Sequence, residues 1–179
     1  MFKHRFSIPV HGQDSVNLLK LMDEVASITG INPPYYRYPP FMGLCKPFSG
    51  SDENTLINAV GKAVTQMKRS RITFHGLSHF GKQFIILPAQ ATLGAAVVIV
   101  ELNKMLSHLP EGARGSCNGD NVLHIPITEK ITREFDRFWP EIQKVRVDLM
   151  TFPLVTIDLC RKPVEGGRWE VVERFHIPA

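Results

Sequence analysis

The predicted secondary structure elements occur in the same order twice along the chain, and this repeat restricts the fold more than any other feature. Helix, loop, short strand, helix, strand and strand are predicted over residues 14–89 and again over residues 92–177, and a strand over residues 2–10 precedes both copies. Two copies of an α+β unit are expected to pack as two lobes around a central cleft. We therefore predict a single α+β domain over residues 1–179, with a duplicated bilobal fold. Its pseudo-symmetric lobes lie at about 11–89 and 92–177, and two antiparallel sheets line the cleft with helices outside.

The short strand of each copy has one face of unusual composition. Residues 121–128 alternate between apolar and other side chains, as a half-buried strand does. Residues 38–48 have the same design, and Phe41 and Gly43 share one of their faces. In the second copy the corresponding face carries three residues: His124, Pro126 and Thr128. The pseudo-symmetry predicts that the two strands lie side by side or face each other across the cleft.

The remaining pattern predicts where the other elements lie. We expect helices over residues 14–30, 49–67, 92–108 and 128–139, the last of them stopped by Pro140. Asp14 and Gly30 are the expected caps of the first helix. The β-branched run at residues 97–100 argues against the third helix, whereas its length and the capping residue Thr92 favour it. A hairpin is expected over residues 71–88, and strands at residues 154–159 and 169–175 close the chain.

Composition and charge exclude several other classes of protein. No run approaches the roughly 18 apolar residues that a membrane-spanning helix needs, and the first residues do not resemble a signal peptide, so we expect a cytoplasmic protein. Cys45, Cys117 and Cys160 form no Cys-x-x-Cys pair, so neither a disulfide framework nor a zinc site is predicted. The net charge of +4 is compatible with a phosphate-bearing ligand, and the scattered basic residues favour a local pocket over a long nucleic-acid-binding stripe.

The order of these pieces resembles the 2H phosphoesterase superfamily, which includes 2′-5′ RNA ligase-like proteins and cyclic nucleotide phosphodiesterases. The resemblance covers nearly the whole chain and rests on segments at residues 39–48, 75–88 and 124–127 and on the strands from residue 154 onward. The segments at 39–48 and 124–127 correspond to the two His-x-Thr/Ser-x motifs of the family, which lie on paired strands of a duplicated bilobal fold. The resemblance implies that fold, chemistry at a phosphodiester, and no metal or other cofactor.

The chemistry of such a site depends on two histidines. To open a 2′,3′-cyclic phosphate, one neutral imidazole takes a proton from the nucleophile and one imidazolium protonates the leaving oxygen. Here Phe41 stands at the first histidine, Gly43 at the first hydroxyl residue and Pro126 at the second, which leaves His124 alone. Losing one acid–base group costs on the order of 10²–10⁴ in rate. The shared fold is therefore better supported than the shared activity.

Our leading hypothesis is a divergent, catalytically impaired protein that binds a nucleotide or the 2′,3′-cyclic phosphate end of an RNA in the cleft. His124 is then the remnant catalytic residue, although a strand histidine can also be satisfied by a neighbouring group. Thr128 could replace a missing hydroxyl or cap the next helix. The cleft residues expected to contact the ligand are Phe41, Gly43, His75, Pro126 and Thr128.

Two loops offer further ligand contacts. Tyr36, Arg37 and Tyr38 could stack a base and hold a phosphate, or could form a proline-stiffened surface loop. Arg114, in a glycine-rich loop, could reach a phosphate beside His124 or stay in solvent.

Two alternatives remain open. An active phosphodiesterase or RNA ligase-like enzyme needs an acid–base partner for His124, and His75 and His79 are the candidates. A protein-interaction module would have a closed apolar cleft, which Phe41 and Pro126 favour. An open cleft in which Arg37, His75 and His124 converge would instead favour a phosphate ligand.

Overall fold

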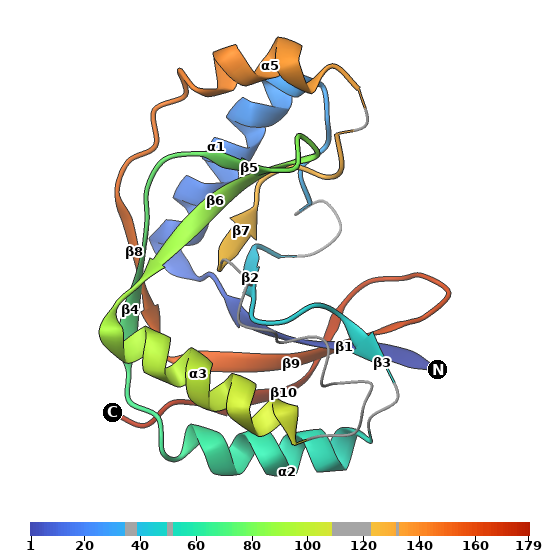
Figure 1. Ribbon diagram of the computed structural model, residues 1–179, viewed down its shortest axis with the longest axis vertical. Coiled ribbons are helices and arrows are strands. Elements are labelled where there is room, and N and C mark those ends of the chain that lie inside the picture. The colour runs from blue at the N-terminus through green and yellow to red at the C-terminus, as the bar shows by residue number, and fades with distance from the viewer. Residues whose placement is uncertain (35–38, 50–51, 109–122, 132) are drawn as a thin grey trace.

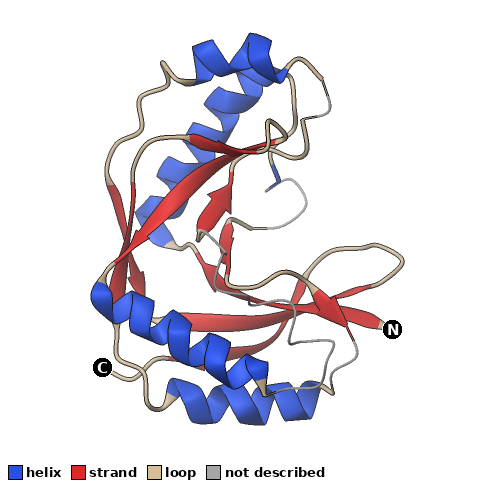
Figure 2. Ribbon diagram, in the orientation of Figure 1, coloured by secondary structure: helices blue, strands red, loops and turns tan. Residues whose placement is uncertain are grey.

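The computed structural model describes the chain except for residues 35–38, 50–51, 109–122 and 132 (Figure 1). The described part contains two antiparallel sheets of five strands each, with helices on their outer sides (Figure 2). The predicted α+β fold, in which two antiparallel sheets line a central cleft with helices outside, is confirmed. Within the described residues, no helix combines the length and the apolar character needed to cross a membrane.

One sheet, here called the β1 sheet, joins strands from both ends of the chain. Its strands are β1 (Phe2–Pro9), β2 (Phe41–Gly43), β3 (Phe48–Ser49), β9 (Thr156–Pro163) and β10 (Glu170–His176). Their order is β10-β9-β1-β2, and β3 also pairs with β1. Alternation along β1 places Phe6 and Ile8 in the hydrophobic core and Arg5 and Ser7 on the opposite face. The register sets Ser7 between Asp158 on β9 and Gly43 on β2, and it sets Arg5 opposite Cys160.

The other sheet, here called the β6 sheet, uses the middle of the chain. Its strands are β4 (Ser70–Phe74), β5 (Ser78–Phe80), β6 (Phe84–Ala91), β7 (His124–Pro126) and β8 (Met150–Leu154). The long strand β6 pairs with β5 and then β4 along one edge and with β7 along the other. The predicted hairpin is confirmed, since Gly81 and Lys82 adopt positive φ angles of 52° and 56° between β5 and β6.

The first three predicted helices are present, although the second begins at Glu53 rather than at residue 49 and ends at Val64 rather than at residue 67. Helix α1 (Gly12–Thr29) packs against α5 (Phe135–Ile142) and β8, α2 (Glu53–Val64) packs against β10, and α3 (Leu93–Ser107) contacts α2, β4 and β6. Gly30 ends α1 in the left-handed conformation with φ of 68°, as predicted. Asp52 caps α2, because its carboxylate accepts a hydrogen bond from Thr55 N at 2.9 Å. Helix α3 forms despite its β-branched run.

The predicted N-cap of α1 was wrong by three residues. His11 is the N-cap, and its side chain makes no capping hydrogen bond. Asp14 lies in the first turn instead, where a negative charge is favourable beside the unpaired N–H groups of the helix.

The predicted helix over residues 128–139 was also wrong at both ends, since α5 spans Phe135–Ile142 and contains Pro140. The chain after β7 continues to pair with β6, because Thr128 N donates to Ile85 O at 3.3 Å and Ile131 N donates to Gln83 O at 2.7 Å. These bonds hold the chain beside β6, with a bend at Thr128 and Glu129, where a helix was expected. Pro140 lies inside this short helix, where it removes one backbone hydrogen bond, and Phe135 and Ile142 are buried at the two ends of the helix.

Two predicted strands are each divided. The first strand of the hairpin expected over residues 71–88 breaks at Gly76, which lies between β4 and β5 and has a φ of 66°. The strand expected over residues 154–159 falls across the end of β8 and the start of β9, which belong to different sheets.

The chain passes between the two sheets more than once, so a sheet is not built from one continuous half of the sequence. The first predicted copy, 11–89, supplies β2 and β3 to the β1 sheet and β4, β5 and most of β6 to the β6 sheet. The second copy, 92–177, supplies β7 and β8 to the β6 sheet and β9 and β10 to the β1 sheet. Each copy thus contributes strands to both sides of the cleft.

Candidate ligand-binding site

The two short strands singled out by the sequence meet between the sheets. β2 belongs to the β1 sheet and β7 to the β6 sheet, yet they contact each other near the middle of the molecule (Figure 1). Met42 and Ile125 are buried at 1% and 0% exposure, whereas Phe41, Gly43, His124 and Pro126 are half-buried. The predicted alternation of both strands is therefore confirmed, and it leaves four predicted site residues on the partly open faces: Phe41, Gly43, His124 and Pro126.

On the β6 sheet, the ring of His124 packs against Phe80, with 5.2 Å between ring centroids. Phe80 and His124 lie on the same face as Ser78 and Pro126, which both pair with Ile86 from opposite sides. The ring of Phe80 therefore lies beside His124, the one histidine that the two motif segments retain.

The two other histidines considered as partners of His124 lie elsewhere. His79 lies on the opposite face of β5 from Phe80, and its ring packs against Phe135 and Trp139 with centroid distances of 5.0 and 4.8 Å. His75 is exposed and follows the last residue of β4. Because β4 and β7 pair with opposite edges of β6, the backbones of His75 and His124 are separated by about two strand spacings, or roughly 10 Å.

Thr128 is buried rather than available at the surface. Its exposure is 2%, and its hydroxyl accepts a hydrogen bond from Ile85 N at 3.1 Å. It does not cap the following helix, because α5 begins at Phe135 and its N-cap is Glu134.

On the β1 sheet, a cavity of about 270 Å³ lies beside Phe41. Its lining includes Arg5 and Ser7 from β1, Asp158 and Cys160 from β9, Trp169, and Arg174 from β10. The guanidinium carbon of Arg5 lies 3.5 Å from the centroid of the Phe41 ring and 4.1 Å from that of the Trp169 ring. Two aromatic rings therefore contact one cation, which is an electrostatically favourable arrangement.

The charged groups of this cavity are strongly paired. Arg174 donates from Nε and Nη2 to the two oxygens of Asp158, each at 2.7 Å, and Asp158 is 2% exposed. These hydrogen bonds raise the pKa of Arg174 above its ordinary value, so this guanidinium keeps its charge. Burial raises the pKa of the Cys160 thiol, and its sulfur lies 3.5 Å from Ser7 Oγ. At neutral pH this thiol is therefore uncharged.

Sequence reasoning did not assign Arg5, Ser7, Asp158, Trp169 or Arg174 to the site. A signal for the first two was present, because these polar residues alternate with the apolar residues Phe6 and Ile8 along the first strand, although Arg5 and Ser7 are themselves buried. No sequence signal shows that β9 and β10 lie beside β1, since the paired residues Ser7 and Asp158 are far apart in the chain. Tyr36, Arg37, Tyr38 and Arg114 lie outside the described residues.

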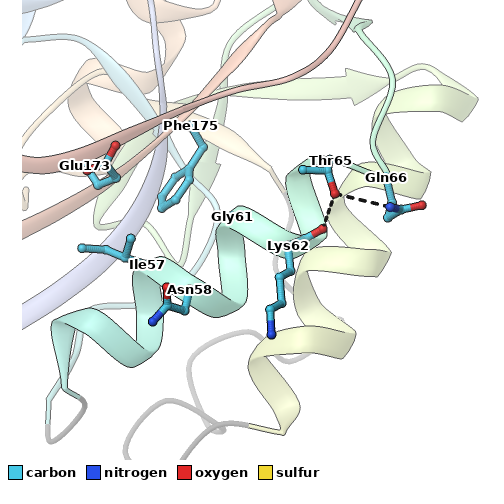
Figure 3. Close-up of a pocket in the computed structure, with 8 residues that line it drawn as sticks. All are labelled: Ile57, Asn58, Gly61, Lys62, Thr65, Gln66, Glu173 and Phe175. Carbon is cyan, nitrogen blue, oxygen red and sulfur yellow. Dashed lines mark hydrogen bonds between the residues drawn. The ribbon is translucent and has the colours of Figure 1, made fainter.

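A larger groove of about 560 Å³ lies between α2 and β10 (Figure 3). It is lined by Gly61 and neighbouring polar residues of α2, together with Glu173 and Phe175. Phe175 faces the core, so this groove lies on the opposite face of β10 from Arg174 and includes none of the predicted site residues. In the described part of the chain, no group of histidine, cysteine, aspartate and glutamate side chains is arranged to hold a metal ion.

The sequence matches no family model and no curated protein. Several solved structures, however, match along nearly the full chain. TT0787 of Thermus thermophilus has a TM-score of 0.71 at 15% identity, with 98% of this chain and 97% of that chain covered. Escherichia coli LigT in complex with 3′-AMP has a TM-score of 0.70 at 10% identity, with 99% and 98% covered. Kluyveromyces marxianus Usb1 with uridine monophosphate has a TM-score of 0.54 at 12% identity, with 99% and 98% covered.

Proposed function

The chain has the two-lobed fold of the 2H phosphoesterase superfamily, to which these three structures belong, and from this premise we propose that it binds a nucleotide or RNA-end phosphate in the cleft without efficient catalysis. The supported ligand class is a phosphate-bearing nucleotide, since LigT and Usb1 are solved with 3′-AMP and uridine monophosphate. The finer ligand we propose is an RNA with a 2′,3′-cyclic phosphate end.

The observation that carries the proposal is the composition of β2 and β7 where they meet. The two strands present Phe41 and Gly43 on one side and His124 and Pro126 on the other. A reaction that needs one proton donor and one proton acceptor finds a single imidazole, that of His124, among these four residues. His79 faces away from the cleft, and this also favours binding over turnover.

The open cavity beside Phe41 favours a ligand over a closed protein-interaction cleft. It has a volume of about 270 Å³ and is lined by two guanidinium groups, those of Arg5 and Arg174. A nucleotide needs such a combination of flat aromatic surface and fixed positive charge.

The first test is turnover of a dinucleotide that ends in a 2′,3′-cyclic phosphate. We expect no hydrolysis above background by the wild type or by His124→Ala. The double variant Phe41→His/Gly43→Thr restores the first motif, and we expect it to gain activity. A side chain fits at Gly43, where the nearest atoms to an added Cβ are 3.8 and 3.9 Å away. The matched control is the same double variant with His124→Ala, which should lose the gained activity.

Binding is measured separately by titrating the wild type with 3′-AMP in a calorimeter. Saturable binding with one site per chain supports the proposal. Turnover by the wild type that disappears in His124→Ala would contradict impaired catalysis. Absence of binding to 3′-AMP and to the cyclic dinucleotide would contradict the ligand class.

A further inference from the structure

The residue that replaces the first motif histidine holds a permanent cation in the cleft. Arg5 borders the cavity, and the centroid of the Phe41 ring lies 3.5 Å from its guanidinium carbon. The centroid of the Trp169 ring lies 4.1 Å from the same guanidinium carbon. Because both rings contact the guanidinium carbon, a ligand would contact Arg5 through the N–H groups at the edge of the guanidinium. Edge-on approach is the geometry in which arginine binds phosphate or carboxylate oxygens in pairs.

A hydroxyl lies directly opposite the position where the first motif lacks one. Ser7 on β1 pairs with Gly43 on β2, and paired residues on neighbouring strands have side chains on the same face. Ser7 also lines the cavity that contains Arg5. Its hydroxyl lies 3.5 Å from Cys160 Sγ, and because a thiol is only a weak hydrogen-bonding partner, Ser7 can still donate to a stronger acceptor.

The charges that line the cavity favour an anion. Among its described lining residues there are two guanidinium groups, Arg5 and Arg174, and one carboxylate, Asp158. Arg174 contacts both oxygens of Asp158, so this carboxylate repels an incoming anion only weakly. The thiol of Cys160 adds no negative charge, because burial raises its pKa.

We propose that Arg5 and Ser7 form an anion subsite that takes the phosphate of the ligand in place of the degenerate first motif, with Phe41 and Trp169 positioning the guanidinium. This inference rests on the proposed nucleotide-binding function and names the residues that perform it. A guanidinium does not release its proton near neutral pH, so this subsite binds a phosphate without acting as an acid or a base. Replacement of histidine by Phe41 therefore exchanges proton transfer for a fixed positive charge.

The test compares 3′-AMP with adenosine, which lacks the phosphate, on four single variants and the wild type. Arg5→Met should weaken 3′-AMP binding by about tenfold or more, the effect of losing a charge-assisted hydrogen bond. Arg5→Lys keeps the charge but loses the planar fork, so we expect an intermediate loss. Ser7→Ala should weaken 3′-AMP binding by roughly three- to tenfold. The control Arg137→Met removes an exposed cation of α5 and should leave 3′-AMP affinity unchanged.

Adenosine affinity should be the same for all of these proteins, because only the phosphate contact has changed. If Arg5→Met, Arg5→Lys and Ser7→Ala all bind 3′-AMP as tightly as the wild type, the subsite is wrong while the proposed function stands. If the wild type itself binds neither 3′-AMP nor a cyclic dinucleotide, the proposed function fails and the subsite fails with it. If Arg5→Met does not unfold cooperatively in urea, Arg5→Lys and Ser7→Ala decide the question.

Discussion

The buried carboxylate of Asp158 depends on one arginine from the neighbouring strand. Its two oxygens accept hydrogen bonds from Arg174, and the carboxylate side chain is 4% exposed against 41% for that of Arg174. A buried charge whose partner is removed keeps its desolvation penalty and loses the compensating bonds. The pair is therefore important to the β1 sheet as well as to the charge of the cavity.

Arg174→Met should lower the free energy of unfolding by roughly 1.5–3 kcal/mol, the range for hydrogen bonds to charged groups. Urea unfolding at neutral pH measures this change. The matched control is Arg137→Met, whose side chain is 72% exposed and whose loss should change stability by less than about 0.5 kcal/mol. A double variant with Asp158→Asn should recover part of the loss, because the unpaired charge is then absent. Equal stability of Arg174→Met and the wild type would show that the pair contributes nothing.

Single residues also show where sequence reasoning reaches its limit. The alternation on β2 and β7 was predictable from apolar periodicity, and it placed Phe41 and His124 on the partly open faces. Thr128 was expected on the face of His124, but its hydroxyl bonds to Ile85, a partner on another strand. Trp169 was not assigned to the site, because its contact with Arg5 joins opposite ends of the chain. Local pattern predicts which face a residue occupies, whereas long-range pairing decides what it contacts.

At the scale of elements, the first turn of α2 is tied to the β1 sheet by a network of charged groups. Glu53 Oε1 lies 3.0 Å from His4 Nε2, and Arg161 Nη1 donates to both oxygens of the same carboxylate. The Nε2 of His4 must donate, because an ionised carboxylate only accepts. Arg161 also donates to Glu170 at 2.6 Å, so the network joins β1, α2, β9 and β10.

This network predicts a pH dependence of stability. The hydrogen bond from His4, followed by the interactions with Arg161, holds the pKa of Glu53 below its ordinary value of 4.5, against the raising effect of burial. A carboxyl with a lowered folded-state pKa stabilises the fold above its unfolded-state pKa and loses that contribution as pH falls through the folded-state pKa. Glu53→Gln should therefore be less stable than the wild type at pH 7, by roughly 1–2 kcal/mol.

The difference between Glu53→Gln and the wild type should shrink as pH is lowered below 4.5, and urea unfolding from pH 7 down to about pH 2.5 measures it. The control is Glu134→Gln, which removes an exposed carboxylate paired with Arg137 at the start of α5 and should show little difference at either pH. If the difference in unfolding free energy between Glu53→Gln and the wild type stayed constant with pH, the lowered pKa of Glu53 would be contradicted.

The boundaries of elements were less predictable than their existence. The apolar stripe of α2 and the cap of α1 at Gly30 follow from local sequence and were correct. The start of α5 was not, because residues 127–131 form backbone hydrogen bonds with β6 that no local pattern reveals. Tertiary hydrogen bonds outweigh helix propensity over this segment.

At the scale of the whole molecule, the chain is interleaved between the sheets. The strand pair β1–β9 joins the first and last parts of the sequence, and the strands between them build the β6 sheet. The repeated order of elements was visible in the sequence, but the exchange of strands between the two copies was not. Such an arrangement predicts that neither side of the cleft is stable without the other, because each sheet loses strands if one part of the chain unfolds.

The two tryptophans of the chain report separately on the two sides. Trp139 packs against Phe135 and His79 beside the β6 sheet, whereas Trp169 packs on Arg5 of the β1 sheet. We expect Trp139→Phe to leave a reporter of the β1 sheet and Trp169→Phe to leave a reporter of the β6 sheet. In each variant, urea unfolding followed by fluorescence should coincide with unfolding of the same protein followed by far-ultraviolet circular dichroism. Comparison within one variant removes any effect of the substitution on stability. A fluorescence midpoint that differed from the circular dichroism midpoint in either variant would mean that one sheet unfolds first, and that the interleaved strands do not couple the two sides.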